Sequence, residues 1–176
     1  MSSLAFWKAV VADKSNFLER VIALLESSGF PYCVIGGVAV NAYAEVAITK
    51  YFDVSVRSND FAAVVEKLHA QFEISTDETE TTIFRTAGSG LEVRVFVAKP
   101  GWGARPKSCQ RMDVCGLQLP VASSDATARF CAERASDIRL RKSHRAIEIY
   151  HLARLVEASP ELLPLIPDTV RESMVA

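Results

Sequence analysis

The stretch Val34-Ile-Gly-Gly-Val-Ala-Val-Asn-Ala-Tyr43, followed by Thr49-Lys-Tyr-Phe-Asp-Val54, decides the fold of this chain. An extended run over 32–35 ends at the pair Gly36-Gly37, and the Ala-rich segment over 38–46 predicts a short helix. Glycine lacks a Cβ, so this kind of turn leaves backbone amides at a helix start open to a phosphate group. Many strand-to-helix turns use glycine only for packing, and the pair alone favours that interpretation.

The next strand carries the polar residues that matter most. A strand over 50–57 places Tyr51, Asp53 and Ser55 on one face, because side chains alternate along an extended chain. Around it, the hydrophobic pattern predicts helices over 16–28 and 60–71, strands over 81–86 and 91–98, a hairpin over 111–121 that turns at Cys115-Gly116, and helices over 124–135 and 144–157. Ser15 is the expected cap of the first helix, and Gly29 its end.

These elements predict an α+β fold, with a mixed β-sheet, flanking helices and a C-terminal helical segment. We expect residues 1–122 to form the α/β domain and residues 123–176 to form helices packed on it as one structural unit. At 176 residues, with 49% hydrophobic and 23% charged residues, the chain is long enough to bury a core.

Charge and cysteine content limit the partners. The chain has 20 basic and 21 acidic residues, so its net charge of −1 gives no indication of nucleic acid binding. The basic residues between 129 and 145 are interpreted as a solvated helix face and its loop. The longest apolar run, over 33–44, is too short to span a bilayer, and no membrane partner is expected. Four cysteines without a Cys-x-x-Cys pair predict reduced, buried thiols and a cytoplasmic location.

The order of these motifs resembles the nucleotidyltransferase superfamily, in particular its minimal domains and the toxin-like branch of abortive-infection systems. Those domains carry Gly-Gly-x-Ala, then about a dozen residues, then Arg-x-Thr-x-Asp-x-Asp on the second strand. In this chain Gly36, Gly37, Thr49 and Asp53 match that pattern. The resemblance covers about residues 30–160.

Three positions depart from the pattern of the family. Its arginine falls on Ala47 and its first aspartate on Tyr51, and an alternative register would pair Asp53 with Ser55. The resemblance implies a third carboxylate from a later strand, for which Glu92 is the candidate. Asp53 and Glu92 would then be the catalytic residues and the ligands of Mg²⁺, with a nucleoside triphosphate as the second cofactor. Neither tyrosine nor serine replaces an aspartate well as a ligand of a hard cation.

Arg94 lies two residues from Glu92 and therefore on the same strand face. It can pair with a neighbouring acid, compete with a metal for the carboxylates, or bind phosphate together with Gly36, Gly37 and Thr49. Two hypotheses follow. The favoured one is a nucleotidyltransferase-fold protein with a degenerate metal site, which binds a nucleotide, a protein partner or a second copy of itself, or which needs no cofactor. The alternative is an active enzyme that transfers a nucleotide to a protein, a tRNA or a small molecule.

Overall fold

A seven-stranded mixed sheet forms the centre of the molecule, in the order β3-β4-β5-β2-β1-β7-β6. The structure is a computed structural model, and it describes residues 2–102 and 109–174. The strands are β1 (Tyr32–Ile35), β2 (Tyr51–Val56), β3 (Glu73–Thr76), β4 (Thr82–Arg85), β5 (Glu92–Val97), β6 (Gln110–Val114) and β7 (Leu117–Val121). β2 pairs with β5 and β1 with β7 in parallel, while the other pairs are antiparallel.

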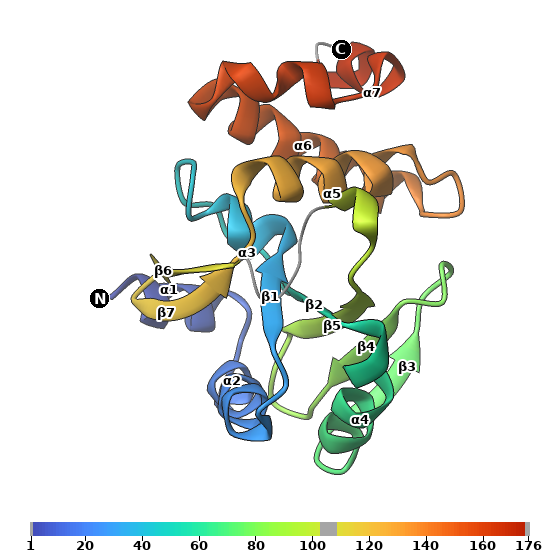
Figure 1. Ribbon diagram of the computed structural model, residues 1–176. Helices are drawn as coiled ribbons and strands as arrows, with labels where there is room; N and C mark the ends of the chain where they lie inside the picture. The colour runs from blue at the N-terminus through green and yellow to red at the C-terminus, as the bar shows by residue number, and fades with distance from the viewer. Residues whose placement is uncertain (1, 103–108, 175–176) are drawn as a thin grey trace.

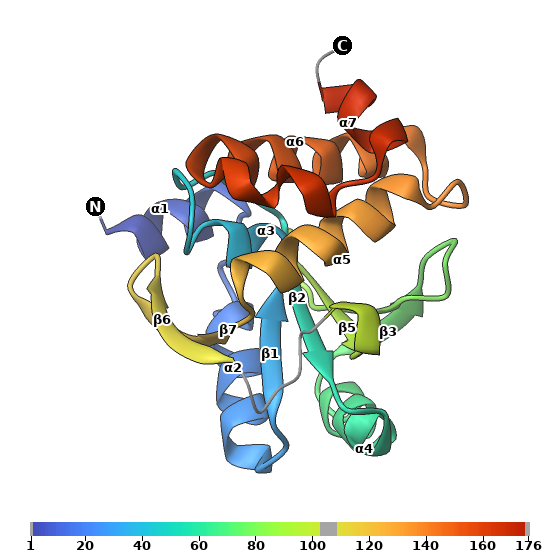
Figure 2. The same cartoon turned by 45° about the horizontal axis from the view of Figure 1, so that its top comes forward.

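Helices cover both faces of this sheet (Figure 1). They are α1 (Ser3–Val10), α2 (Phe17–Ser28), α3 (Gly36–Val40), α4 (Ser58–His69), α5 (Ser124–Ser136), α6 (Lys142–Ala158) and α7 (Asp168–Met174), with 3-10 turns η1 (Pro100–Trp102) and η3 (Pro160–Leu165). Figures 1 and 2 show α5, α6 and α7 gathered on one side and α2 and α4 on the other. Each side has its own apolar cluster. The expected α+β fold class is therefore confirmed, whereas the division at residue 122 stays a prediction.

The alternation along β2 decides which side chains meet the C-terminal helices. Phe52 and Val54 are buried in the cluster that includes α2 and α4. The intervening positions of β2, beginning with Tyr51 and Asp53, point to the opposite face. There Ile35 of β1 and Phe96 of β5 join the apolar cluster of α5 and α6. The polar face of β2 is thus covered by helices instead of facing solvent.

Several local expectations differ from the structure. The helix after the glycines ends at Val40, and the segment that follows forms turns. Asp13, not Ser15, caps α2, because its carboxylate accepts hydrogen bonds from the amides of Phe17 (2.9 Å) and Leu18 (3.2 Å). Helix α1 and strand β3 were not expected. The Cys115-Gly116 turn is confirmed, with both residues at positive φ (55° and 88°) between β6 and β7.

The expectation of reduced thiols is wrong for one pair of cysteines. Cys33 in β1 and Cys109, just before β6, form a disulfide across 76 residues of sequence. Cys115 and Cys131 are free. Disulfides are more typical of oxidising compartments, so the cytoplasmic location stays a prediction. Within the described residues, no helix combines the length and the apolar character needed to cross a bilayer.

Candidate functional site

The sequence-predicted residues come together where β1, β2 and β5 lie side by side. Asp53 is opposite Ile35 of β1 on one side and opposite Arg94 of β5 on the other. Glu92 is opposite Tyr51. The structure therefore places Asp53 and Glu92 on one face of adjacent strands. It also places a cation, Arg94, at the position directly across from Asp53.

Asp53 and Arg94 form a buried, two-point ion pair. Nε of Arg94 donates to Oδ1 of Asp53 at 2.5 Å, and Nη2 donates to Oδ2 at 2.6 Å. Asp53 is 1% exposed and Arg94 3%. Burial alone would lower the pKa of Arg94, but the charge and hydrogen bonds of Asp53 raise this pKa above its usual value. Both carboxylate oxygens of Asp53 are thus occupied by a permanently charged guanidinium.

The ion pair continues into helices α5 and α6. Nη2 of Arg94 lies 3.6 Å from Oε1 of Glu148 in α6, and Nε of Arg134 in α5 donates to the same oxygen at 3.2 Å. Arg134 also lies 3.9 Å from Asp77, in the turn between β3 and β4. These buried ion pairs form a network of alternating charges that links helices α5 and α6 to the sheet. It corrects the interpretation of the basic stretch as wholly solvated, because Arg134 is buried while Arg129, Arg139, Arg141 and Lys142 are exposed.

The two glycines pack against side chains of the same site. Gly36 has φ of +67°, a conformation that suits glycine, and a Cβ there would overlap the Asp53 carboxylate. A Cβ on Gly37 would lie 2.6 Å from Nε2 of His151 and 3.3 Å from Oγ1 of Thr49. The Thr49 hydroxyl in turn accepts a hydrogen bond from the amide of Tyr51 at 3.1 Å. Internal packing alone therefore accounts for both glycines, and the phosphate-binding roles of Gly36, Gly37, Thr49 and Arg94 stay predictions.

The residues at this position do not fit a divalent metal. Mg²⁺ needs several oxygen ligands in octahedral geometry, but Asp53 is held by Arg94 and the partner aspartate of the family is Tyr51. The Glu92 carboxylate is held by Arg85 at 3.0 Å. Across residues 2–102 and 109–174, no three His, Cys, Asp or Glu side chains are grouped so as to hold a metal ion. Ser55 is buried and carries no carboxylate, and Ala47 has no side-chain ligand, so neither position supplies the metal ligand that Tyr51 lacks.

An open cleft of about 370 Å³ remains beside Tyr51. The Tyr51 hydroxyl lies 3.4 Å from Nε2 of His144, and Nδ1 of His144 lies 3.4 Å from Oε1 of Glu78. The guanidinium of Arg94 lies 4.1 Å from the centre of the Tyr51 ring on the buried side. The cleft is lined by Lys50, Tyr51, Thr76, Asp77, Glu78, Ile83, Arg85, Glu92, Arg94, Arg141 and His144.

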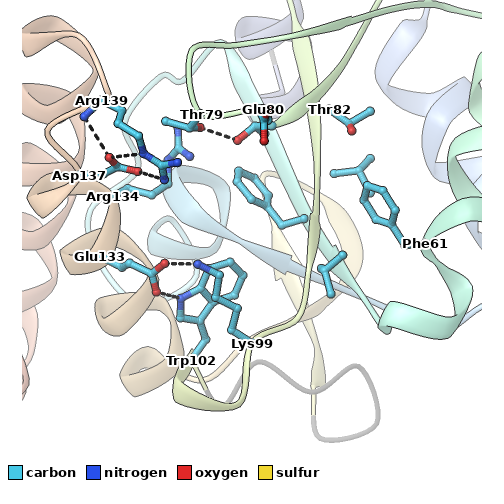
Figure 3. A pocket seen from close by; sticks show the side chains of 14 residues that line it. Phe61, Thr79, Glu80, Thr82, Lys99, Trp102, Glu133, Arg134, Asp137 and Arg139 are labelled. Carbon is cyan, nitrogen blue, oxygen red and sulfur yellow. Dashed lines mark hydrogen bonds and ion pairs between the residues drawn. The ribbon is translucent and has the colours of Figure 1, made fainter.

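A smaller pocket, of about 220 Å³, lies between α4, β4, β5 and α5 (Figure 3). Its cations, Lys99, Arg134 and Arg139, are paired with carboxylates of the chain, whereas the exposed Glu80 forms no ion pair among the described residues. Figure 3 shows Lys99 and Trp102 both directed to Glu133, and Arg139 directed to Asp137. Because each of these cations already has a carboxylate partner, this pocket offers no free cation to an anionic ligand, and the cleft beside Tyr51 is the better candidate site.

The sequence did not predict that Glu148 and Arg134 extend the ion pair of Asp53 and Arg94. It also did not predict that His151 packs against Gly37. Glu148 lies on α6 at position i−3 from His151, a spacing that places both on one helix face. That spacing was readable in the sequence, but nothing in it showed that this face docks on β2 and β5.

The sheet and its flanking helices have the fold of nucleotidyltransferases, as two solved structures show. The antibiotic-resistance factor ANT(2'')-Ia, in complex with adenylyl-2''-tobramycin, has a similar structure, with a TM-score of 0.58 and 10% identity over 90% of this chain and 97% of that one. The lincosamide antibiotic adenylyltransferase LnuA, lincomycin-bound, has a TM-score of 0.52 and 12% identity over 81% of this chain and 98% of that one. No family model and no curated sequence matches. The likeness establishes the fold.

Proposed function

We propose that this protein has kept the nucleotidyltransferase fold but not the transfer reaction, and that it acts by binding a ligand or a partner. The observation that carries the proposal is the buried pair between Asp53 and Arg94. The carboxylate that would hold the metal is already neutralised from within the chain.

Replacing the guanidinium by a metal would be costly. The metal would have to break two short charge-assisted hydrogen bonds, and it would share a buried site with the charge of Arg94. Arg94 is also held by Glu148 and stacked on Tyr51, so its neighbours keep it in place. Apart from Asp53 and Glu148, no carboxylate of the described residues forms an ion pair with Arg94.

A nucleotide is the first ligand to test, and the cleft beside Tyr51 is where we place it. Lys50 and Arg141 are exposed cations at its edge, suited to phosphate oxygens, and the partly exposed His144 ring offers aromatic surface to a base. A protein partner, including a second copy of the chain, is the other kind of ligand that this proposal admits.

The test combines binding and catalysis on the full chain. Thermal unfolding is followed while Mg²⁺-ATP or Mg²⁺-GTP is titrated, and pyrophosphate release is measured in parallel. We expect stabilisation by a nucleotide, or by a partner, without release of pyrophosphate. Release that is lost in Asp53→Asn but kept in the matched variant Asp125→Asn, an exposed aspartate in the first turn of α5, would refute the proposal. The protein would then be an active transferase acting on a protein, a tRNA or a small molecule.

A further inference from the structure

The largest of the open pockets described here lies away from the Asp53 position and is not used by the proposed function. It encloses about 490 Å³ between the segment after α3 and the second half of α6. Its lining consists of Glu45, Val46, Ala47, Tyr150, Arg154, Glu157 and Ala158.

Arg154 is a buried cation without a carboxylate partner. Only 7% of it is exposed, yet no Asp or Glu of the described residues forms an ion pair with it. Nη2 donates to Oδ1 of Asn41 at 2.8 Å and to the carbonyl of Glu45, while Nη1 has no hydrogen-bond partner in the part of the chain that the structure describes. In the part of the chain that the structure describes, the other two buried arginines, Arg94 and Arg134, each contact a carboxylate.

This contrast indicates a role beyond packing. A neutral side chain could bind Asn41 and the Glu45 carbonyl without the cost of burying a charge. A buried guanidinium at the wall of a pocket is instead compensated when an anionic group enters, and its planar donors match carboxylate or phosphate oxygens. Burial lowers the pKa of Arg154, and the charges of Glu45 and Glu157, which form no ion pair with it, offset this effect only in part.

The rim of the pocket has the opposite charge. Glu45 and Glu157 are exposed, and neither forms an ion pair within the described residues. Tyr150 is 54% exposed, and its ring centre lies 5.5 Å from the guanidinium carbon of Arg154. A ligand that complements the buried cation and the acidic rim has an anionic group at Arg154 and an ammonium group near Glu45 and Glu157. The exposed ring of Tyr150 can add a cation–π interaction with that ammonium group.

We propose that this pocket binds a small zwitterion, whose carboxylate or phosphate pairs with Arg154 and whose ammonium group lies between Glu45 and Glu157. Neither Asp53 nor the cleft beside Tyr51 takes part. Binding of a zwitterion in this pocket is therefore independent of nucleotide binding in the cleft beside Tyr51.

Isothermal titration calorimetry on the full chain tests the ligand class. The probes are γ-aminobutyrate and O-phosphoethanolamine as zwitterions, butyrate as the anion alone, and butylammonium as the cation alone. At least one zwitterion should bind about tenfold more tightly than either singly charged probe, and which of the two binds distinguishes carboxylate from phosphate. The proposal fails if neither zwitterion binds up to about 10 mM, or if butyrate binds as tightly.

Two variants locate the site. Arg154→Gln keeps a polar group for Asn41 and should weaken zwitterion binding by about thirtyfold or more. The double variant Glu45→Gln/Glu157→Gln changes only exposed side chains, so it tests the proposal even if Arg154→Gln does not fold. It should reduce the affinity for the zwitterion to that for its anion-only counterpart. Glu161→Gln, an exposed glutamate in η3 outside the pocket, is the matched control. Unchanged binding in the double variant would overturn the proposal.

Discussion

The pair between Asp53 and Arg94 can be tested by removing one charge at a time. Arg94→Gln leaves Asp53 buried with no other cation at ion-pair distance among the described residues, whereas Asp53→Asn leaves Arg94 with Glu148 at 3.6 Å. Losing one partner of a buried pair costs about 3–5 kcal/mol. We therefore expect Arg94→Gln to lose that amount of unfolding free energy, and Asp53→Asn to lose less.

The double variant Asp53→Asn/Arg94→Gln completes the cycle. It replaces both charges by amides, so its loss should be smaller than the sum of the single losses by about 2 kcal/mol or more. Urea unfolding gives the free energies, and thermal unfolding of Arg94→Gln should show a midpoint lower by about 6–20 °C.

A surface pair provides the control for this cycle. Arg85→Gln removes a partner of Glu92 from a pair whose arginine side chain is 42% exposed, and it should cost at most about 1 kcal/mol. If Arg94→Gln costs no more than Arg85→Gln, or if the two single losses simply add, the buried ion pair does not close the site as we argue.

Three further perturbations are predicted. The double variant Tyr51→Asp/Arg94→Asp places three carboxylates together, which need a cation. It should therefore be less stable than the wild-type chain in EDTA, and Mg²⁺ at ten times its Kd should restore about 1.4 kcal/mol of unfolding free energy. The stability of the wild-type chain should not change with Mg²⁺. Burial lowers the pKa of His151 below 6.5, so the unfolded chain takes up a proton before the folded chain does as pH falls. The unfolding free energy should therefore decline below about pH 6.5, by at most about 1.4 kcal/mol per pH unit. Urea unfolding of His151→Gln should no longer show this slope. Cys109→Ser should lower the unfolding free energy by about 4 kcal/mol, since the disulfide to Cys33 closes a loop of 76 residues.

Each of these predictions has a matched comparison. For the metal, Tyr51→Asn/Arg94→Asn should show no recovery with Mg²⁺, and an equal recovery would refute the argument from carboxylate number. His69→Gln removes an exposed histidine of α4 and should leave the pH slope unchanged. Cys115→Ser removes a free cysteine, and a loss as large as that of Cys109→Ser would show that the disulfide is not the cause.

The local features of the sequence were enough for the fold class, and they placed Asp53 on a strand that lies beside the strand of Glu92. Helical and alternating apolar patterns predicted most of the strands and helices, and Gly36-Gly37 predicted the turn between β1 and α3. The alternation of β2 placed Asp53 on the face that became the site. Strand β3 was missed because it is a short, exposed edge strand with little apolar signal.

What the sequence by itself determined is therefore the order of the elements, the glycine turn and the shared strand face of Tyr51 and Asp53. Only the tertiary structure decided that Arg94 binds Asp53, that Glu148 and Arg134 extend this pair into the helices, and that Cys33 meets Cys109. The physical reason is that these contacts join residues 14 to 76 positions apart. They depend on strand register, where a shift of one residue would turn Arg94 to the other face, and on how α5 and α6 dock on the sheet. Tyr51 is visible in the sequence alone, whereas the guanidinium that binds both carboxylate oxygens of Asp53 is visible only in the tertiary structure.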